Sequence, residues 1–132
     1  MNILDELRRR GITVTATEGG RLRLPATTPP ETVANIRESR DVLLDALQDE
    51  AEDDIARWPW VYRRWLAQTI GFALREGFSK RQAFWMAHRD VRAALEADRA
   101  RVIAEAAEDG MLRAAIDSGL VTVDQVAAGG AT

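Results

Sequence analysis

The chain has 132 residues, 46% of them hydrophobic and 30% charged, and its formal net charge is −3. This composition is typical of one compact folded domain or two very small ones. Cysteine is absent, which excludes disulfides, thiolate chemistry and cysteine-ligated metals. No apolar run reaches the length of a membrane span, and the first residues predict an amphipathic helix rather than a signal peptide, so we expect a cytoplasmic protein.

The first predicted element is a short amphipathic helix over residues 1–10. Ile3, Leu4 and Leu7 recur at helical spacing, with acidic side chains in the first turn and three arginines at the end. That order of charges suits the helix dipole, which favours anions at the amino end and cations at the carboxyl end. Gly11 is expected to end this helix, because glycine readily adopts the left-handed conformation found after helix C-termini.

Residues 11–24 predict a small β-hairpin, because apolar and polar side chains alternate with the period of two that is typical of a half-buried strand. Cross-strand partners must share a face, which selects a three-residue loop over residues 18–20. This register pairs Thr15 with Arg23 and Ala16 with Leu22. The apolar face then carries Ile12, Val14, Ala16, Leu22 and Leu24. The polar face carries Thr13, Thr15, Thr17, Arg21 and Arg23.

After the proline-containing stretch 25–30, hydrophobic residues at helical spacing predict one broken helix or two adjoining helices, with Ser39 as the cap between them. These hydrophobic residues are Val33, Ile36, Val42, Leu43, Leu44 and Leu47. An acidic run up to Asp54 follows directly on this helical segment. We interpret the run as a solvated helix face, and a segment that pairs with Arg21 and Arg23 of another copy is the alternative.

Residues 1 to about 48 resemble the N-terminal docking domains typified by the tubulysin synthetase subunit TubC, a module of helix, hairpin, helix and helix. The resemblance rests on the hairpin, the proline-containing loop and a basic residue among spaced hydrophobic positions. The matching residues are Leu4, Leu7, Gly11, Ile12, Val14, Gly20, Leu22, Val33, Ile36, Arg40, Leu43, Leu44 and Leu47. Synthetase members of this family continue into a megasynthase, whereas about 80 residues follow here without a carrier or adenylation motif.

This resemblance implies a module that dimerises and captures a short, acidic, C-terminal peptide of a partner protein. The peptide is implied to add to the hairpin as a further strand, with basic side chains nearby. Carried over to this chain, Arg21 and Arg23 are the expected contacts, on the face that also carries Thr13, Thr15 and Thr17. An unpaired strand edge supports the same expectation, since proteins seldom leave such an edge exposed without a use.

Residues 57–92 combine most of the aromatic side chains with a local excess of positive charge, 8 basic against 2 acidic residues. Pro59 is well placed to begin a helix and Gly77 breaks it. Ser79 and Gln82 then form a capping box that opens a second helix of about 30 residues, ending near Asp109. The apolar face of the first helix is expected to comprise Val61, Trp65, Ile70, Phe72 and Ala73.

Two interpretations of this helix pair stay open. In the first, the tryptophans are core residues or anchors of a dimer interface. In the second, the pair is a helix-turn-helix that binds nucleic acid, with tryptophan stacked on bases and basic side chains on phosphates. The candidate phosphate contacts are Arg63, Arg64, Lys80 and Arg81. The supposed recognition helix is poor in Asn, Gln, Ser and Thr, and acidic segments flank the pair, which favours the first interpretation.

Nothing in the sequence predicts a catalytic centre. His88 is the only histidine, and residues that commonly form nucleophile elbows, phosphate-binding glycine loops or metal sites do not occur at the required spacings. We therefore expect no enzyme activity, no metal and no cofactor.

The sequence as a whole predicts a mostly helical α+β protein. It divides into a docking module over residues 1–50, a helical domain over 51–128 and a disordered tail over 129–132. Within the helical domain, a short helix is expected to stop at Gly119, and a turn capped by Thr122 follows. We expect a homodimeric docking or adapter protein that binds a partner peptide at its hairpin; a small nucleic-acid-binding accessory or regulatory protein is the alternative.

Overall fold

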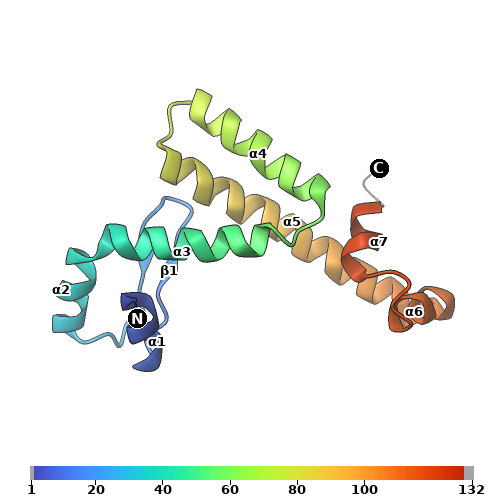
Figure 1. Cartoon of the computed structure of the whole chain (residues 1–132), viewed down its shortest axis with the longest axis horizontal. Coiled ribbons are helices and arrows are strands. Elements are labelled where there is room, and N and C mark those ends of the chain that lie inside the picture. Colours follow the sequence, from blue (N-terminus) through green and yellow to red (C-terminus); the bar gives the residue numbers. More distant parts are fainter. Residues whose placement is uncertain (1, 130–132) are drawn as a thin grey trace.

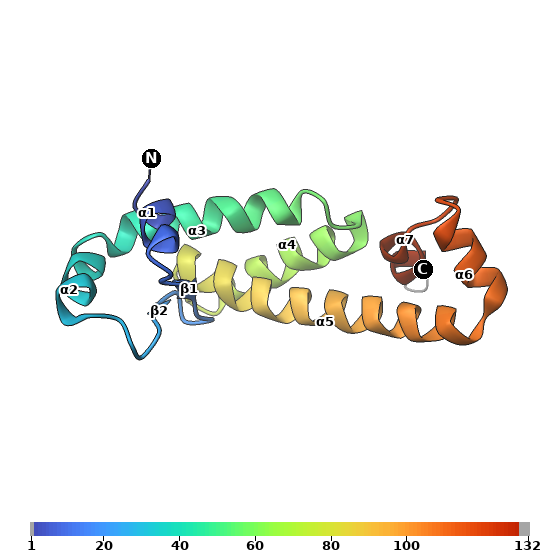
Figure 2. The same cartoon turned by 90° about the horizontal axis from the view of Figure 1, so that it is seen from below.

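The computed structural model describes residues 2–129 and confirms an α+β fold dominated by helices, with a two-stranded antiparallel sheet. Helix α5 forms the long axis of the molecule (Figures 1 and 2). The N-terminal helices and the hairpin gather near its start, α4 runs back alongside it, and α6 and α7 fold against its far end. In chain order the elements are α1 (Ile3–Arg9), β1 (Thr15–Ala16), β2 (Leu22–Arg23), α2 (Pro30–Glu38), α3 (Arg40–Ile55), α4 (Trp60–Arg75), α5 (Lys80–Glu108), α6 (Gly110–Asp117) and α7 (Val123–Gly129).

Helix α1 begins and ends as the sequence predicts. Asn2 caps its first turn, because the Asn2 Oδ1 accepts a hydrogen bond from the Asp5 N–H at 2.8 Å. Leu4 and Leu7 are buried, and the chain leaves the helix at Gly11 with a φ of +77°. A residue with a side chain would be strained in that conformation, which explains the glycine.

The hairpin has the predicted register. Thr15 pairs with Arg23 and Ala16 pairs with Leu22, around a loop of residues 18–20. Each strand is only two residues long, so the sheet itself contributes few hydrogen bonds. The hairpin is therefore stabilised mainly by its apolar face, which packs against the surrounding helices. On this face Val14 is only 2% exposed.

Helices α2 and α3 meet at Ser39, as predicted, although the Ser39 side chain makes no capping hydrogen bond. Helix α3 continues to Ile55, so the acidic residues expected to follow it lie on the helix itself, and most of them are exposed. Val42, expected on the apolar face, is 59% exposed, whereas its neighbours Leu43 and Leu44 are fully buried. Three consecutive residues span most of a helical turn, so one of them had to face away from the core.

Helices α4 and α5 form an antiparallel hairpin whose ends match the prediction. Pro59 precedes α4, and Gly77 breaks the chain after it with a φ of +96°. The capping box of α5 is complete, since Ser79 and Gln82 each bond the backbone N–H of the other. Helix α5 runs for 29 residues, and Asp109 ends it.

The buried face of α4 matches the predicted one only in part, since Val61, Ile70 and Ala73 pack toward the core as expected. Trp65 and Phe72 were expected in the core, but they are 46% and 66% exposed. Of the predicted positions, Ala73 is buried. The other buried positions of α4 are Tyr62 and Leu66, which pack in the cluster shared with α5. Trp65 and Phe72 each precede a buried residue, Leu66 and Ala73, by one position, so periodicity alone could not choose between the two stripes.

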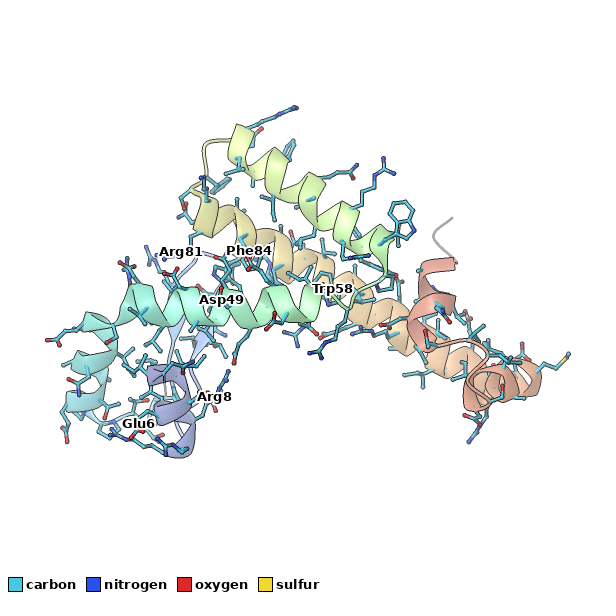
Figure 3. The ribbon with its side chains drawn as sticks, viewed as in Figure 1. Glu6, Arg8, Asp49, Trp58, Arg81 and Phe84 are labelled. Atoms are coloured by element: carbon cyan, nitrogen blue, oxygen red, sulfur yellow. The ribbon has the colours of Figure 1, made fainter. Side chains whose placement is uncertain are left out.

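Two adjoining hydrophobic clusters stabilise the fold. The first joins the N-terminal elements to the start of α5, and its buried members are Leu4, Leu7, Val14, Ile36, Leu43, Leu47, Phe84 and Trp85. The second joins α4 to the middle of α5, and its buried members are Trp58, Tyr62, Leu66, Ala87, Val91 and Leu95. Ile55 and Ile70 pack against both clusters. Figure 3 shows Phe84 between α5 and α3, and Trp58 at the turn that leads from α3 to α4.

The C-terminal helices close the far end of α5. Thr122 caps α7 in a reciprocal pair with Gln125, and Ala127 is 1% exposed. Helix α7 ends at Gly129, the first residue of the predicted tail, and residues 130–132 lie outside the described part of the chain. None of the helices within residues 2–129 is long and apolar enough to cross a membrane.

Candidate docking groove

A groove of about 690 Å³ lies between β1, α3 and the first half of α5. Its size is within the range of ligand-binding clefts. The hairpin wall comprises Thr13, Val14, Thr15, Ala16, Thr17, Glu18 and Arg23. The helical walls comprise Arg8 from α1, Leu47, Glu50, Ala51 and Asp54 from α3, and Trp85, His88, Arg89, Arg92, Ala93 and Glu96 from α5. The predicted contacts Thr13, Thr15, Thr17 and Arg23 therefore share one groove, whereas Arg21 is not among the lining residues.

The outer edge of β1 opens into this groove. The Thr17 N–H donates to the Arg21 carbonyl at 2.7 Å, which fixes the alternation of bonded pairs along the hairpin. In an antiparallel ladder the next bonded pair is Thr15 with Arg23, so the N–H and C=O of Ala16 point away from β2. Ala16 lines the groove. Within the described chain, its backbone N–H and C=O form no hydrogen bond with residues outside the hairpin.

The floor of the groove includes part of an aromatic cluster from α5 and the turn before α4. The His88 ring stacks on Trp58 at 5.7 Å and on Phe84 at 5.8 Å between ring centroids, and meets the edge of Trp85 at 5.5 Å. Trp85 and His88 are each 7% exposed. The Trp85 Nε1 is the one fully buried side-chain polar atom within residues 2–129 that lacks a hydrogen-bond partner. Such a group is uncommon in a folded protein and invites an explanation.

His88 is held in its neutral form. Burial lowers its pKa below the ordinary value of 6.5, and the nearby Arg92 guanidinium lowers it further. Asp54 on α3 and Glu96 on α5 oppose this effect. At neutral pH the imidazole therefore carries one proton, and its uncharged ring packs between aromatic neighbours.

The charged side chains around the groove are mostly paired with one another. Arg8 forms a two-pronged ion pair with Glu50 at 2.5 and 2.6 Å, which raises the pKa of Arg8 and lowers that of Glu50. Further along the rim, Arg92 pairs with Glu96 at 2.9 Å, and Arg89 approaches Glu18 at 3.6 Å. The Asp54 carboxylate accepts a hydrogen bond from the indole of Trp58 at 3.2 Å.

Arg23 differs from these rim residues. Its guanidinium is exposed and forms no ion pair within the described residues, so it is a cation without a counterion at the groove. An exposed arginine of this kind is well suited to bind a carboxylate, because its planar fork donates two parallel hydrogen bonds.

The four candidate nucleic-acid contacts do not form one patch. Arg63 and Arg64 lie near the start of α4, whereas Lys80 and Arg81 lie at the start of α5, at the other end of the antiparallel hairpin (Figure 1). Arg81 bonds Asp41 at 3.0 Å and Asp45 at 3.1 Å, which joins α5 to α3. Figure 3 places Arg81 at this junction. Arg64 lies over the ring of Trp60 at 5.9 Å from its centroid.

Sequence reasoning missed the contribution of α5 to the groove. The tryptophans were interpreted as core or dimer residues, or in the alternative as residues that stack on bases, and His88 was given no role in binding. The spacing of the two along α5 places them on neighbouring turns of one face, but only the fold brings β1 over that face. No local pattern in the sequence carries this information.

The described residues contain no group of three or more histidine, cysteine or acidic side chains arranged to hold a metal ion. Comparisons with protein-family models, with curated proteins and with solved structures find no match to this chain. The resemblance of residues 1 to about 48 to TubC-type docking domains therefore stays a prediction.

Proposed function

We propose that this protein is a non-enzymatic docking module that captures an extended, acidic peptide of a partner protein along the outer edge of β1. The observation that carries the proposal is the groove that follows this edge. A peptide in the groove adds a strand to the hairpin and bonds the free N–H and C=O groups of Ala16. Main-chain bonds then supply much of the affinity, and the groove walls select the side chains.

The charge preference of the groove follows from Arg23. The other rim arginines already have acidic partners within the chain, so an arriving carboxylate gains most from Arg23. Thr13, Thr15 and Thr17 provide hydroxyls along the same wall. Because Arg23 is exposed, its contribution is expected to weaken as salt concentration rises.

The first test is affinity purification of the tagged full chain from its source cell, followed by mass spectrometry and mapping of the bound segment. Arg23→Glu is expected to lower capture at least about tenfold, because it replaces attraction by repulsion. Arg21→Glu is the matched control, since it makes the same charge change on the same hairpin outside the groove. Equal capture by wild type and by Arg23→Glu contradicts the proposal, as does nucleic acid as the only salt-sensitive copurifying partner.

The main-chain contribution has its own pair of variants. Ala16→Pro removes the N–H that faces the groove while keeping the paired N–H of Thr15, and proline is tolerated at such edge positions. Ala16→Val keeps the N–H and changes only the side chain. We expect Ala16→Pro to lose the mapped peptide and Ala16→Val to retain it. The opposite order of affinities excludes strand addition at β1.

We further propose that a second copy of the chain packs on the exposed face of α4. Trp65 and Phe72 lie on this face two helical turns apart, and both are largely exposed. If two α4 helices pack antiparallel around Gln68, Trp65 of one copy meets Phe72 of the other. Burying such aromatic pairs is a common source of interface stability.

Light scattering tests this self-association. Phe72→Glu places a charge in the centre of the proposed contact and is expected to yield monomers. Met111→Glu is the control, because Met111 is 86% exposed on α6, away from α4. A wild-type protein that is monomeric at high concentration contradicts the dimer, and leaves the peptide groove as the only proposed interface.

A further inference from the structure

The floor of the groove belongs to α5, outside the N-terminal segment that resembles a docking domain. Trp85 and His88 come from this helix, and they lie opposite the hairpin wall that carries Arg23. The two walls are therefore separated by about 60 residues in sequence. A ligand in the groove contacts both parts of the chain at once.

We infer that the docked peptide inserts one carboxylate side chain into the groove, where it accepts a hydrogen bond from the Trp85 indole N–H and balances the charge of Arg23. This inference rests on the proposed function and adds to it a specificity site on α5. It names the chemical class of the selected residue as aspartate or glutamate.

The unpartnered indole N–H supports a ligand acceptor at this point. The Trp85 Nε1 is fully buried, yet the chain itself provides no acceptor for it. By contrast, the indole N–H of Trp58, in the same aromatic cluster, is satisfied by Asp54 at 3.2 Å. A buried donor without a partner destabilises the free protein, and an arriving acceptor removes that cost on binding.

The choice of a carboxylate over a neutral acceptor follows from the charges around the floor. Glu50 and Glu96 are each paired with an arginine, whereas Asp54 forms no ion pair within the described chain and accepts the Trp58 indole hydrogen bond. On the hairpin wall, Arg23 is a cation without a counterion in the described chain, so a carboxylate that reaches this wall gains an ion pair, and its hydrogen bond to the indole is stronger than that of a neutral acceptor. An amide side chain satisfies the indole but leaves Arg23 without a counterion.

The site also accounts for the position of His88. Its ring nitrogens form no hydrogen bond within the described chain, and it lines the groove beside Trp85. A neutral imidazole donates one further hydrogen bond through its protonated nitrogen. Side-chain rotation at an interface commonly accompanies binding, and a small adjustment of Trp85 and His88 brings their donors to the ligand.

The test uses the immobilised full chain and a positional-scanning library of acetylated, amidated hexapeptides. Wild type is expected to select aspartate or glutamate at one position over asparagine and glutamine by about tenfold or more. Trp85→Phe keeps an aromatic ring and removes only the N–H, so it should retain peptides but lose most of this selection. Trp60→Phe is the matched control, because Trp60 is 60% exposed and does not line the groove.

The outcomes separate the inference from the proposed function. If wild type captures no peptide, the docking function itself is wrong. If it captures peptides without an acidic preference, or if Trp85→Phe keeps the full preference, docking stands and the α5 site is overturned. A titration with the selected peptide, followed through the indole N–H resonances by NMR, adds an atomic readout. The Trp85 resonance is expected to shift downfield, and a shift confined to the other three indoles contradicts the inference.

Discussion

The two ends of α5 differ in whether all of the polar groups around them have partners. At the far end, Arg99 binds Asp124 of α7 through two hydrogen bonds of 2.5 and 2.8 Å, and the Tyr62 hydroxyl donates to Asp98 at 2.5 Å. At the near end, the Trp85 indole N–H has no acceptor in the described chain, and Arg23 has no counterion there. One helix thus has a closed end and an open end.

This difference separates groups that hold the fold together from groups that are available for binding. Satisfied polar pairs at the far end join α4, α5 and α7 to one another. Near the start of α5 most charged groups are paired as well, but the Trp85 indole N–H and the Arg23 guanidinium line the groove without partners in the described chain. Variants at the closed end should therefore lower stability and spare peptide capture. Variants of exposed groove residues such as Arg23 should lower peptide capture and spare stability.

The largest effect on stability is expected for Leu95→Ala, in the cluster that joins α4 to α5. Leu95 is fully buried, and removing such a side chain usually lowers the free energy of unfolding by about 2–5 kcal/mol. Urea unfolding measures this loss. Where the variant is folded, its affinity for the captured peptide should equal that of wild type; a matching loss of affinity would show that the two ends are not independent.

Tyr62→Phe should have the next largest effect on stability. It removes the hydroxyl that donates to the partly exposed Asp98 carboxylate, and the loss of a hydrogen bond to a charged acceptor lowers the free energy of unfolding by about 1–2 kcal/mol. Burial, with help from Asp98, raises the pKa of Tyr62 from 10 to about 12. The unfolded chain thus loses this proton first as pH rises, so wild-type stability should fall between pH 10 and 12. Tyr62→Phe should show a shallower fall, and identical alkaline profiles would rule out this role.

Asp124→Asn is expected to have a smaller effect, about 1 kcal/mol or less, because the pair with Arg99 is about one-third exposed. Thermal unfolding with and without added salt measures it. The salt sensitivity of wild type should diminish in the variant. Asp117→Asn on α6, in a pair that is far more exposed, provides the control and should change little.

The smallest effect on stability is expected from the protonation of His88, at the open end. Burial lowers the pKa of His88 in the folded chain, so below pH 6.5 the unfolded chain binds more protons. Stability should fall as pH drops from 6.5 toward the lowered pKa and level off beneath it. Arg92, Asp54 and Glu96 are the charged groups that act on this ring. Unfolding midpoints of wild type and His88→Gln, measured across this pH range, check the prediction, because stability should depend less on pH in the variant. An equal dependence on pH in both proteins would assign the fall in stability to the carboxylates.

The local structure could be predicted wherever neighbouring residues determine it. The hairpin register followed from the alternation of Ala16 and Leu22 with polar residues, and the start of α5 followed from the capping box of Ser79 and Gln82. These features depend on contacts a few residues apart in sequence. They are therefore visible in the sequence before any tertiary packing is known.

The tertiary part of the site could not be predicted in the same way. Phe72 and Ala73 adjoin in sequence and both fit an apolar stripe of α4, yet only Ala73 is buried. The choice depends on which stripe meets α5. Likewise, the four predicted contacts on the hairpin gained their opposite wall from Trp85 and His88, which only the packing of α5 against β1 brings together.

Hydrogen exchange at the amide of Ala16 tests the central claim most directly. The measurement compares the full chain alone with the chain saturated by its captured peptide. Strand addition at β1 predicts that the Ala16 amide becomes strongly protected, while amides of α7 near Asp124 keep their rates. Unchanged exchange at Ala16, with protection appearing instead along α4 around Arg63 and Arg64, would contradict the account.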